Sequence, residues 1–185
     1  MTAPLLLQVV ERVRAAFSLS GTFLEDLAGR IDCYGPVWIS ITLAVLIFIA
    51  GSLSTYSLLP TPDYLSILSS SLFYILFYLG IVVGGGWMVL RWLGADSIYF
   101  TELLCLFGYS LVFFFPLIAI SQLRIKLLTW LAALAVGGAS SFFVYQNLYA
   151  ALRTSALGVD RAFFYSVVIL FLHAIFVLSV KALFL

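Results

Sequence analysis

Two side chains of this sequence could do proton or ion chemistry inside an apolar segment. His173 is the sole histidine and lies about 18 Å along a helix from Arg161, at about 1.5 Å per residue. Glu102 stands where another apolar run begins. An ionisable group within a membrane is a functional candidate. For His173 we prefer a neutral imidazole hydrogen-bonded to a neighbouring helix, because no carboxylate lies at comparable depth to relay a proton.

Three carboxylates, Asp32, Asp96 and Glu102, flank apolar runs and are expected on one side of a membrane. They could coordinate a cation or meet a basic partner. The alternative, which we prefer, is three solvated or helix-capping groups, since a carboxylate favours a helix N-terminus. A single histidine excludes a multi-histidine metal site. Without clustered nucleophiles or acids, a lipid-modifying enzyme ranks last, and we expect no catalysis, cofactor or metal.

Composition indicates a membrane protein. Of the 185 residues 64% are hydrophobic and 9% are charged, whereas soluble domains carry about 25% charged residues. The net charge of +1 gives no basic patch for nucleic acid. Cys33 and Cys105 are too few for a disulfide framework and are expected to be reduced at the cytosolic boundary.

Apolar runs predict an all-α bundle of five transmembrane helices, since a span needs about 20 residues and must satisfy its own backbone. The expected spans are 37–57, 66–90, 103–122, 127–149 and 162–185. Pro36 suits the first turn of the first span, and Pro116 should kink the third by removing a bond to the Val112 carbonyl.

Arginine and lysine placement predicts a cytosolic N-terminus and a lumenal C-terminus. The lumenal side would hold Arg124, Lys126 and Lys181. The cytosolic side would hold twice as many: Arg12, Arg14, Arg30, Arg91, Arg153 and Arg161. Residues 1–30 form a short cytosolic segment, either a surface amphipathic helix or a frayed tail.

Small residues indicate where helices approach closely. Gly80 and Gly84 have GxxxG spacing in the second span, and Gly137 to Ser141 form a small-residue cluster in the fourth. We interpret both as packing surfaces within the bundle, the alternatives being a pore or a dimer seam.

Two motifs resemble the Yip family of Ypt/Rab-interacting membrane proteins, called YIPF proteins in animals. Asp32-Cys33-Tyr34-Gly35-Pro36-Val37-Trp38-Ile39 is similar to that family's D-L-Y-G-P-F-W-I entry to the first span. The segment from Phe100 to Leu111, followed by Pro116, is similar to its F-x-E-x-x-C-x-Y-G-Y-S-L…P segment. The entry most resembles the subgroup with YIPF-one and YIPF-two.

The resemblance implies a five-span domain over residues 31–185 in Golgi, ER–Golgi or endosomal membranes. It implies a role in vesicle-mediated transport without catalysis, and partners that include membrane lipid, Rab GTPases and sibling Yip proteins in homo- or hetero-oligomers. The partner-binding candidates are residues of the two motifs: Asp32, Tyr34, Gly35, Pro36, Glu102, Gly108 and Tyr109.

The chain departs from the family pattern in its N-terminal segment and at two motif positions. About thirty residues precede the first motif, where the family has a long cytosolic region, which predicts a diverged or truncated member. Cys33 replaces leucine, and Phe107 stands where tyrosine is common.

The alternative function is a small transporter or channel that uses His173 and Glu102, although few other polar groups lie near the midplane of the membrane.

Overall fold

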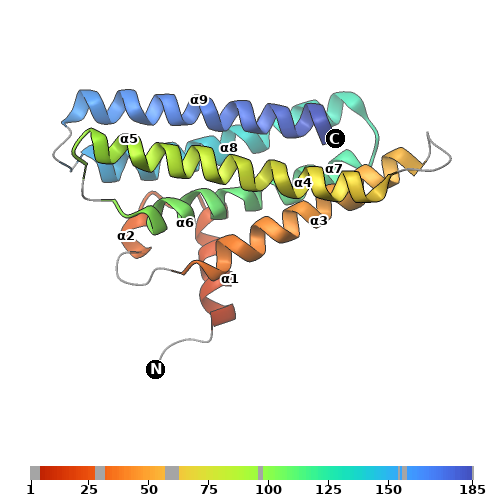
Figure 1. Cartoon of the computed structure of the whole chain (residues 1–185), viewed down its shortest axis with the longest axis horizontal. Coiled ribbons are helices and arrows are strands. Elements are labelled where there is room, and N and C mark those ends of the chain that lie inside the picture. Colours follow the sequence, from red (N-terminus) through yellow and green to blue (C-terminus); the bar gives the residue numbers. More distant parts are fainter. Residues whose placement is uncertain are drawn as a thin grey trace.

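A computed structural model describes residues 5–27, 32–56, 63–95, 98–153, 155 and 158–184. Their regular elements are all helical (Figure 1). In chain order these elements are α1 Leu5–Phe17, α2 Phe23–Leu27, α3 Tyr34–Tyr56, α4 Tyr64–Tyr78, the π-helix η1 Leu79–Gly85, α5 Gly86–Trp92, α6 Phe100–Ser110, the 3-10 turn η2 Leu111–Phe113, α7 Phe114–Ser121, α8 Lys126–Arg153 and α9 Val159–Phe184.

Five helical segments are long and apolar enough to cross a membrane, as the sequence predicts. They are α3, the continuous run α4–η1–α5, the run α6–η2–α7, α8 and α9. Their bounds differ from the predicted spans by a few residues, and each helical segment begins one to three residues before the predicted start. Pro36 lies in the first turn of α3, where its missing N–H costs nothing.

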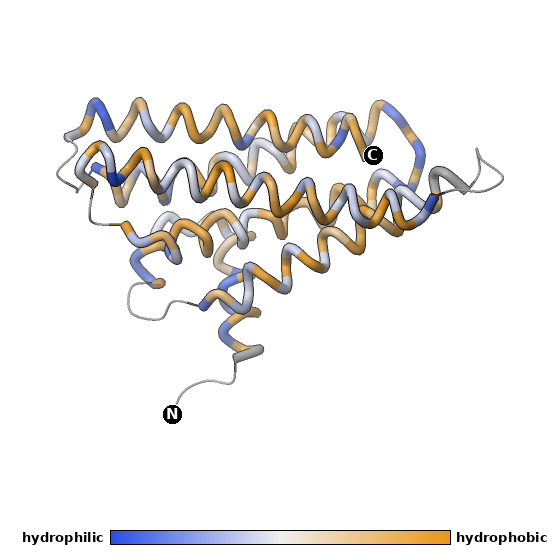
Figure 2. The backbone as a smooth tube through the Cα atoms, in the orientation of Figure 1, coloured by the Kyte–Doolittle hydropathy of each residue, from blue (hydrophilic) through white to orange (hydrophobic). Residues whose placement is uncertain are grey.

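The outer surface of the bundle is apolar along the length of the helices. Leu65 is 76% exposed, Leu127 72% and Phe164 71%. Figure 2 shows hydrophobic residues along the long helices and hydrophilic ones mainly at their ends and in the N-terminal helices. Such a surface is stable in lipid and not in water, so the five helices are those of an integral membrane protein.

The α6–η2–α7 segment is the centre of the bundle. In its most apolar stretch 72% of residues are buried, against 28–39% in the other four spans. Phe107 and Phe114 are fully enclosed. The chain tightens into the 3-10 turn η2 just before Pro116, the residue expected to break the hydrogen-bond pattern here.

The two predicted small-residue clusters differ in how closely another helix approaches them. A methyl group built on Gly137 would lie 2.7 Å from Val177 Cγ1 on α9, so α8 and α9 pack closely there. Gly80 and Gly84 would meet nothing within 4 Å, so their expected packing role inside the bundle is not what the structure shows. The close approach near them is instead at Gly86, where a methyl group would lie 2.8 Å from the Tyr165 hydroxyl.

The N-terminal helices cross the bundle instead of following it. A helix forms over α1, whereas the sequence left a frayed tail open. Val9, Val13 and Ala16 of α1 pack against the core. In Figure 1, α1 runs roughly across the direction of α8 and α9, and α2 lies beneath α6. Helix α1 contacts α2, α6 and η2, and α2 also contacts α6 and α8.

Candidate functional site

The Asp32 side chain is the centre of a buried junction between the N-terminal segment and the bundle. It is 7% exposed and forms an ion pair with Arg12 of α1 at 3.2 Å. Its Oδ1 accepts the Tyr34 backbone N–H at 2.8 Å, which caps the start of α3. Its Oδ2 accepts the Tyr109 hydroxyl at 3.3 Å. One carboxylate therefore joins α1, α3 and α6.

The backbone of residues 32–36 packs in direct contact with α6. A Cβ on Gly35 would lie 2.0 Å from the Tyr109 hydroxyl, and a Cβ on Gly108 would lie 2.4 Å from Pro36 Cβ. The Cys105 thiol donates to the Asp32 carbonyl at 3.1 Å. Both glycines are required because a side chain would occupy the neighbour's space. The two sequence motifs thus interlock.

Amides of α8 hold the connection between α1 and α2. Asn147 Nδ2 donates to the Ser20 carbonyl at 2.8 Å, and its Oδ1 accepts the Phe23 N–H at 2.9 Å. Gln146 Nε2 donates to the Leu19 carbonyl at 2.6 Å. Sequence reasoning missed these two residues. The available signal was two adjacent amides in an apolar helix, where a polar side chain requires a partner.

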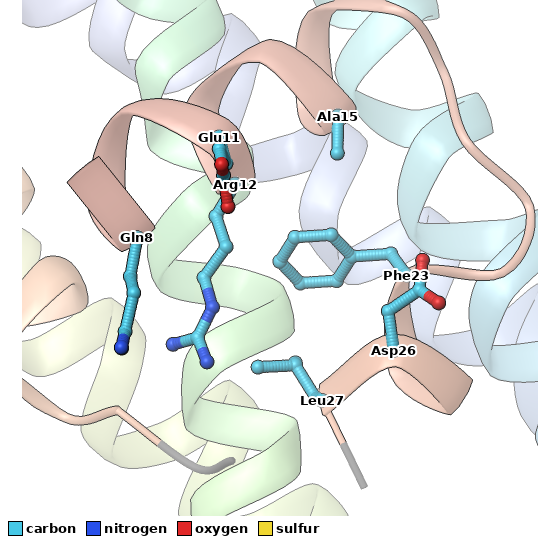
Figure 3. Close-up of a pocket in the computed structure, with 7 residues that line it drawn as sticks. All are labelled: Gln8, Glu11, Arg12, Ala15, Phe23, Asp26 and Leu27. Atoms are coloured by element: carbon cyan, nitrogen blue, oxygen red, sulfur yellow. The ribbon is translucent and has the colours of Figure 1, made fainter. Parts of the chain in front are cut away.

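A cleft of about 430 Å³ opens between α1 and α2 (Figure 3). Charged side chains at its edge are Glu11 and Arg12 from α1 and Asp26 from α2, while Phe23 and Leu27 form its apolar part. Glu11 and Asp26 are exposed. The Phe23 ring packs edge-on against Tyr109 at 5.5 Å, so the cleft rests directly on the junction.

Most of the predicted partner-binding residues cannot touch a partner. The structure buries five of the seven, and these are Asp32, Gly35, Pro36, Gly108 and Tyr109. Tyr34 is 46% exposed and packs beside Trp38. Glu102 is half-buried and accepts the Tyr99 N–H at 3.0 Å, which caps α6. The expected docking surface is therefore corrected to a packing junction with Tyr34 at its accessible edge.

His173 is fully buried between three helices. Its Nε2 is 2.8 Å from the Ser140 hydroxyl on α8, and its Nδ1 meets the Tyr78 hydroxyl on α4. This is the hydrogen-bonded imidazole preferred from the sequence. Glu102 belongs to a different hydrogen-bonded group at the start of α6. The two residues that the transporter alternative would use thus belong to separate hydrogen-bonded groups.

The remaining reactive groups are scattered. Among residues that the structure describes, no three histidine, cysteine, aspartate or glutamate side chains gather as metal ligands. Cys33 is an exposed free thiol and Cys105 a buried one. Asp96, expected beside Asp32 and Glu102, lies outside the described residues.

Comparison with known proteins shows similarity to a curated relative. No family model matches the chain, and no solved structure does. The chain is 21% identical over 150 residues to a curated protein named YIPF1 homolog, from Dictyostelium discoideum. The match covers 76% of this chain and 42% of that relative, so the chain spans less than half of the relative's length. The chain is thus similar to a YIPF1 homolog over most of its five-helix bundle.

Proposed function

We propose that this chain is a Yip-family membrane protein, close to the YIPF-one and YIPF-two type. It supports vesicle-mediated transport in Golgi, ER–Golgi or endosomal membranes, without catalysis, by binding Rab GTPases and sibling Yip proteins. Residues 31–185 are its membrane domain, and its N-terminus is cytosolic and its C-terminus lumenal. The observation that carries the proposal is the contact between Asp32–Pro36 and Cys105–Tyr109, since the two segments that resemble the family meet in one junction.

The junction suggests how a partner could be received. The junction and the α8 amides Gln146 and Asn147 together fix α1 and α2 against α6 and α8, so the cleft between these two short helices keeps its shape. The cleft has exposed carboxylates at Glu11 and Asp26 and an apolar floor at Phe23 and Leu27. A basic and apolar segment of a GTPase would complement it. The partner-binding role moves from the buried motif to this cytosolic cleft and to Tyr34.

Partner recovery from cells tests the proposal. The double variant Glu11→Lys/Asp26→Lys reverses the charge of the cleft edge without altering the Asp32 junction. We expect recovery of Rab GTPases with the full chain to fall by about tenfold, as electrostatic complementarity is lost. Tyr34→Ala should reduce recovery by a smaller factor. The readout is quantitative mass spectrometry of proteins co-purified in mild detergent.

Arg14→Glu is the matched control, because Arg14 is an exposed charge on α1 that does not line the cleft. It should leave recovery unchanged. Undiminished recovery with the double variant would contradict the proposed role of the cleft in partner binding. Absence of any Rab GTPase or sibling Yip protein with the unaltered chain would contradict the proposed function itself. Gly35→Leu is unsuitable as a docking variant because its side chain would collide with Tyr109.

A further inference from the structure

A second cavity, formed by η1 and α5 on one side and α9 on the other, is separate from the N-terminal helices. This groove has a volume of about 680 Å³, within the range of about 300–1,000 Å³ of small-molecule sites. Its walls are mainly apolar, and they include Ile81, Val89, Val168, Ile169 and Leu172. The groove also has polar groups at defined positions along α9.

One of these polar groups is the Tyr165 hydroxyl. Tyr165 is 5% exposed, and among the described residues its oxygen has no hydrogen-bond partner. It lies against Gly86, which lines the same groove, because a Cβ there would be 2.8 Å from the hydroxyl. A buried hydroxyl without a hydrogen-bond partner is unfavourable, because it has lost its contact with water. A ligand in the groove that accepts a hydrogen bond would remove that cost.

The other polar groups are at the mouth of the groove. Asp160 and Arg161 are exposed, line the groove and occupy the first turn of α9. Arg161 and Tyr165 are four residues apart, so they share a helix face about 6 Å apart along the axis. Helix N-terminal N–H groups and the guanidinium both favour an anion here. Trp92, 86% exposed beside them, is typical of the membrane interface.

From the start of α9 inward, the groove is therefore lined first by charged side chains, then by the Tyr165 hydroxyl and then by apolar side chains. That order is the depth profile of a glycerophospholipid, with phosphate, ester and acyl chain. Side-by-side cationic and anionic side chains at the mouth match a zwitterionic headgroup better than an anionic one. Gly85 lines this groove, and a Cβ at this position would meet nothing within 4 Å. An acyl chain therefore has room beside Gly85.

We propose that this groove binds one zwitterionic glycerophospholipid. The Arg161 guanidinium holds its phosphate, Asp160 faces its ammonium group, the Tyr165 hydroxyl donates to an ester carbonyl, and one acyl chain lies along the apolar walls. The site goes beyond the proposed GTPase binding and uses no residue of the cleft. It makes the lipid a structural ligand of the cytosolic half of α9.

Photo-crosslinking tests the site. The full chain is reconstituted in phosphatidylcholine liposomes with a phosphatidylcholine that carries a diazirine near the end of one acyl chain, and adducts are mapped by mass spectrometry. We expect adducts to concentrate on residues 81–93 and 164–172. Gly85→Phe fills the groove and should lower these adducts about fivefold or more. Gly84→Phe, on the same element and equally open but outside the groove, should stay near the unaltered chain.

Two further variants address the polar contacts. Tyr165→Phe keeps the ring and should lower labelling about three- to fivefold, since only a hydrogen bond is lost. Arg161→Glu should lower it about as much, yet leave labelling by a diazirine-bearing geranylgeraniol unchanged, because that probe has no phosphate. If Gly85→Phe fails to fold, Val168→Trp fills the groove from the α9 wall.

Three results would overturn the proposal. Adducts spread evenly over the outer faces, unaffected by Gly85→Phe or Val168→Trp, would indicate ordinary surrounding lipid. Labelling by the isoprenoid probe alone would identify a different occupant. Stronger labelling by an otherwise identical phosphatidylglycerol probe would contradict the zwitterionic assignment at Asp160.

Discussion

Asp32 shows how the polar groups of this molecule are used at the scale of single residues. Its two oxygens interact with Arg12, the Tyr34 N–H and the Tyr109 hydroxyl, so the carboxylate connects three segments of the chain. His173 is engaged in the same way by Ser140 and Tyr78. Asp32 and His173 thus hold helices together.

Replacing Asp32 should lower stability in two steps. Asp32→Asn removes the charge that pairs with Arg12 but keeps an oxygen for the Tyr34 N–H. Asp32→Ala removes both and leaves buried donors without an acceptor, so it should cost roughly 2–3 kcal/mol and the asparagine less. The measurement is the free energy of unfolding in mixed detergent and dodecyl sulfate.

A double-mutant cycle with Arg12→Leu isolates the ion pair, because the two side chains are in direct contact. The cycle should give a coupling energy of about 1 kcal/mol or more. A coupling near zero, with equal losses for the alanine and asparagine variants, would mean that the carboxylate does not join α1 to α6.

At the scale of elements, the contact of α8 with α9 can be tested with neighbouring glycines. Gly137→Ala places a methyl group 2.7 Å from Val177 Cγ1. Val177 is β-branched and cannot rotate away freely, so we expect roughly 1–3 kcal/mol of destabilisation. The midpoint of thermal unfolding in detergent reports the loss.

Gly138→Ala is the adjacent control, since its methyl group would meet nothing within 4 Å. It should be neutral or raise stability by about 0.5–1 kcal/mol, because alanine favours a helix more than glycine does. Equal behaviour of the two variants would show that α8 does not approach α9 at Gly137.

The elements themselves were predictable, and their contacts were not. Apolar runs and prolines located the five spans, because hydropathy and backbone constraints act locally along the chain. GxxxG spacing predicted a packing role for Gly80 and Gly84. The prediction was wrong because this spacing does not identify the partner helix or the face of the helix that points into the bundle. The π-helix over Leu79–Gly85 changes that facing, and Gly86 makes the contact.

The contacts of the Asp32 junction could not be predicted from the sequence either. The motif residues from Asp32 to Pro36 were expected at an accessible rim because they flank a span. The burial of Asp32, Gly35 and Pro36 depends on contacts with Gly108 and Tyr109, which belong to a distant segment of the chain. Chain spacing does not encode such contacts. The ion pair of Arg12 with Asp32 likewise depends on how α1 crosses the bundle, which the positions of the two residues along the chain do not indicate.

For the whole molecule, an odd number of spans requires α3 to start on the opposite side of the membrane from the end of α9. The chain contains its own reporters of this arrangement. Cys33 is an exposed thiol at the start of α3, and Cys105 is a thiol buried in the junction. Leu183, near the end of α9, is 65% exposed and can accept an introduced cysteine.

Maleimide labelling in sealed microsomes, with a reagent that cannot cross the membrane, tests the five-span fold and its buried junction together. The account predicts modification of Cys33 in intact vesicles, modification of Leu183→Cys only after the membrane is permeabilised, and protection of Cys105 until the protein is denatured. Labelling of Leu183→Cys in intact vesicles, or of Cys105 in the folded protein, would contradict it.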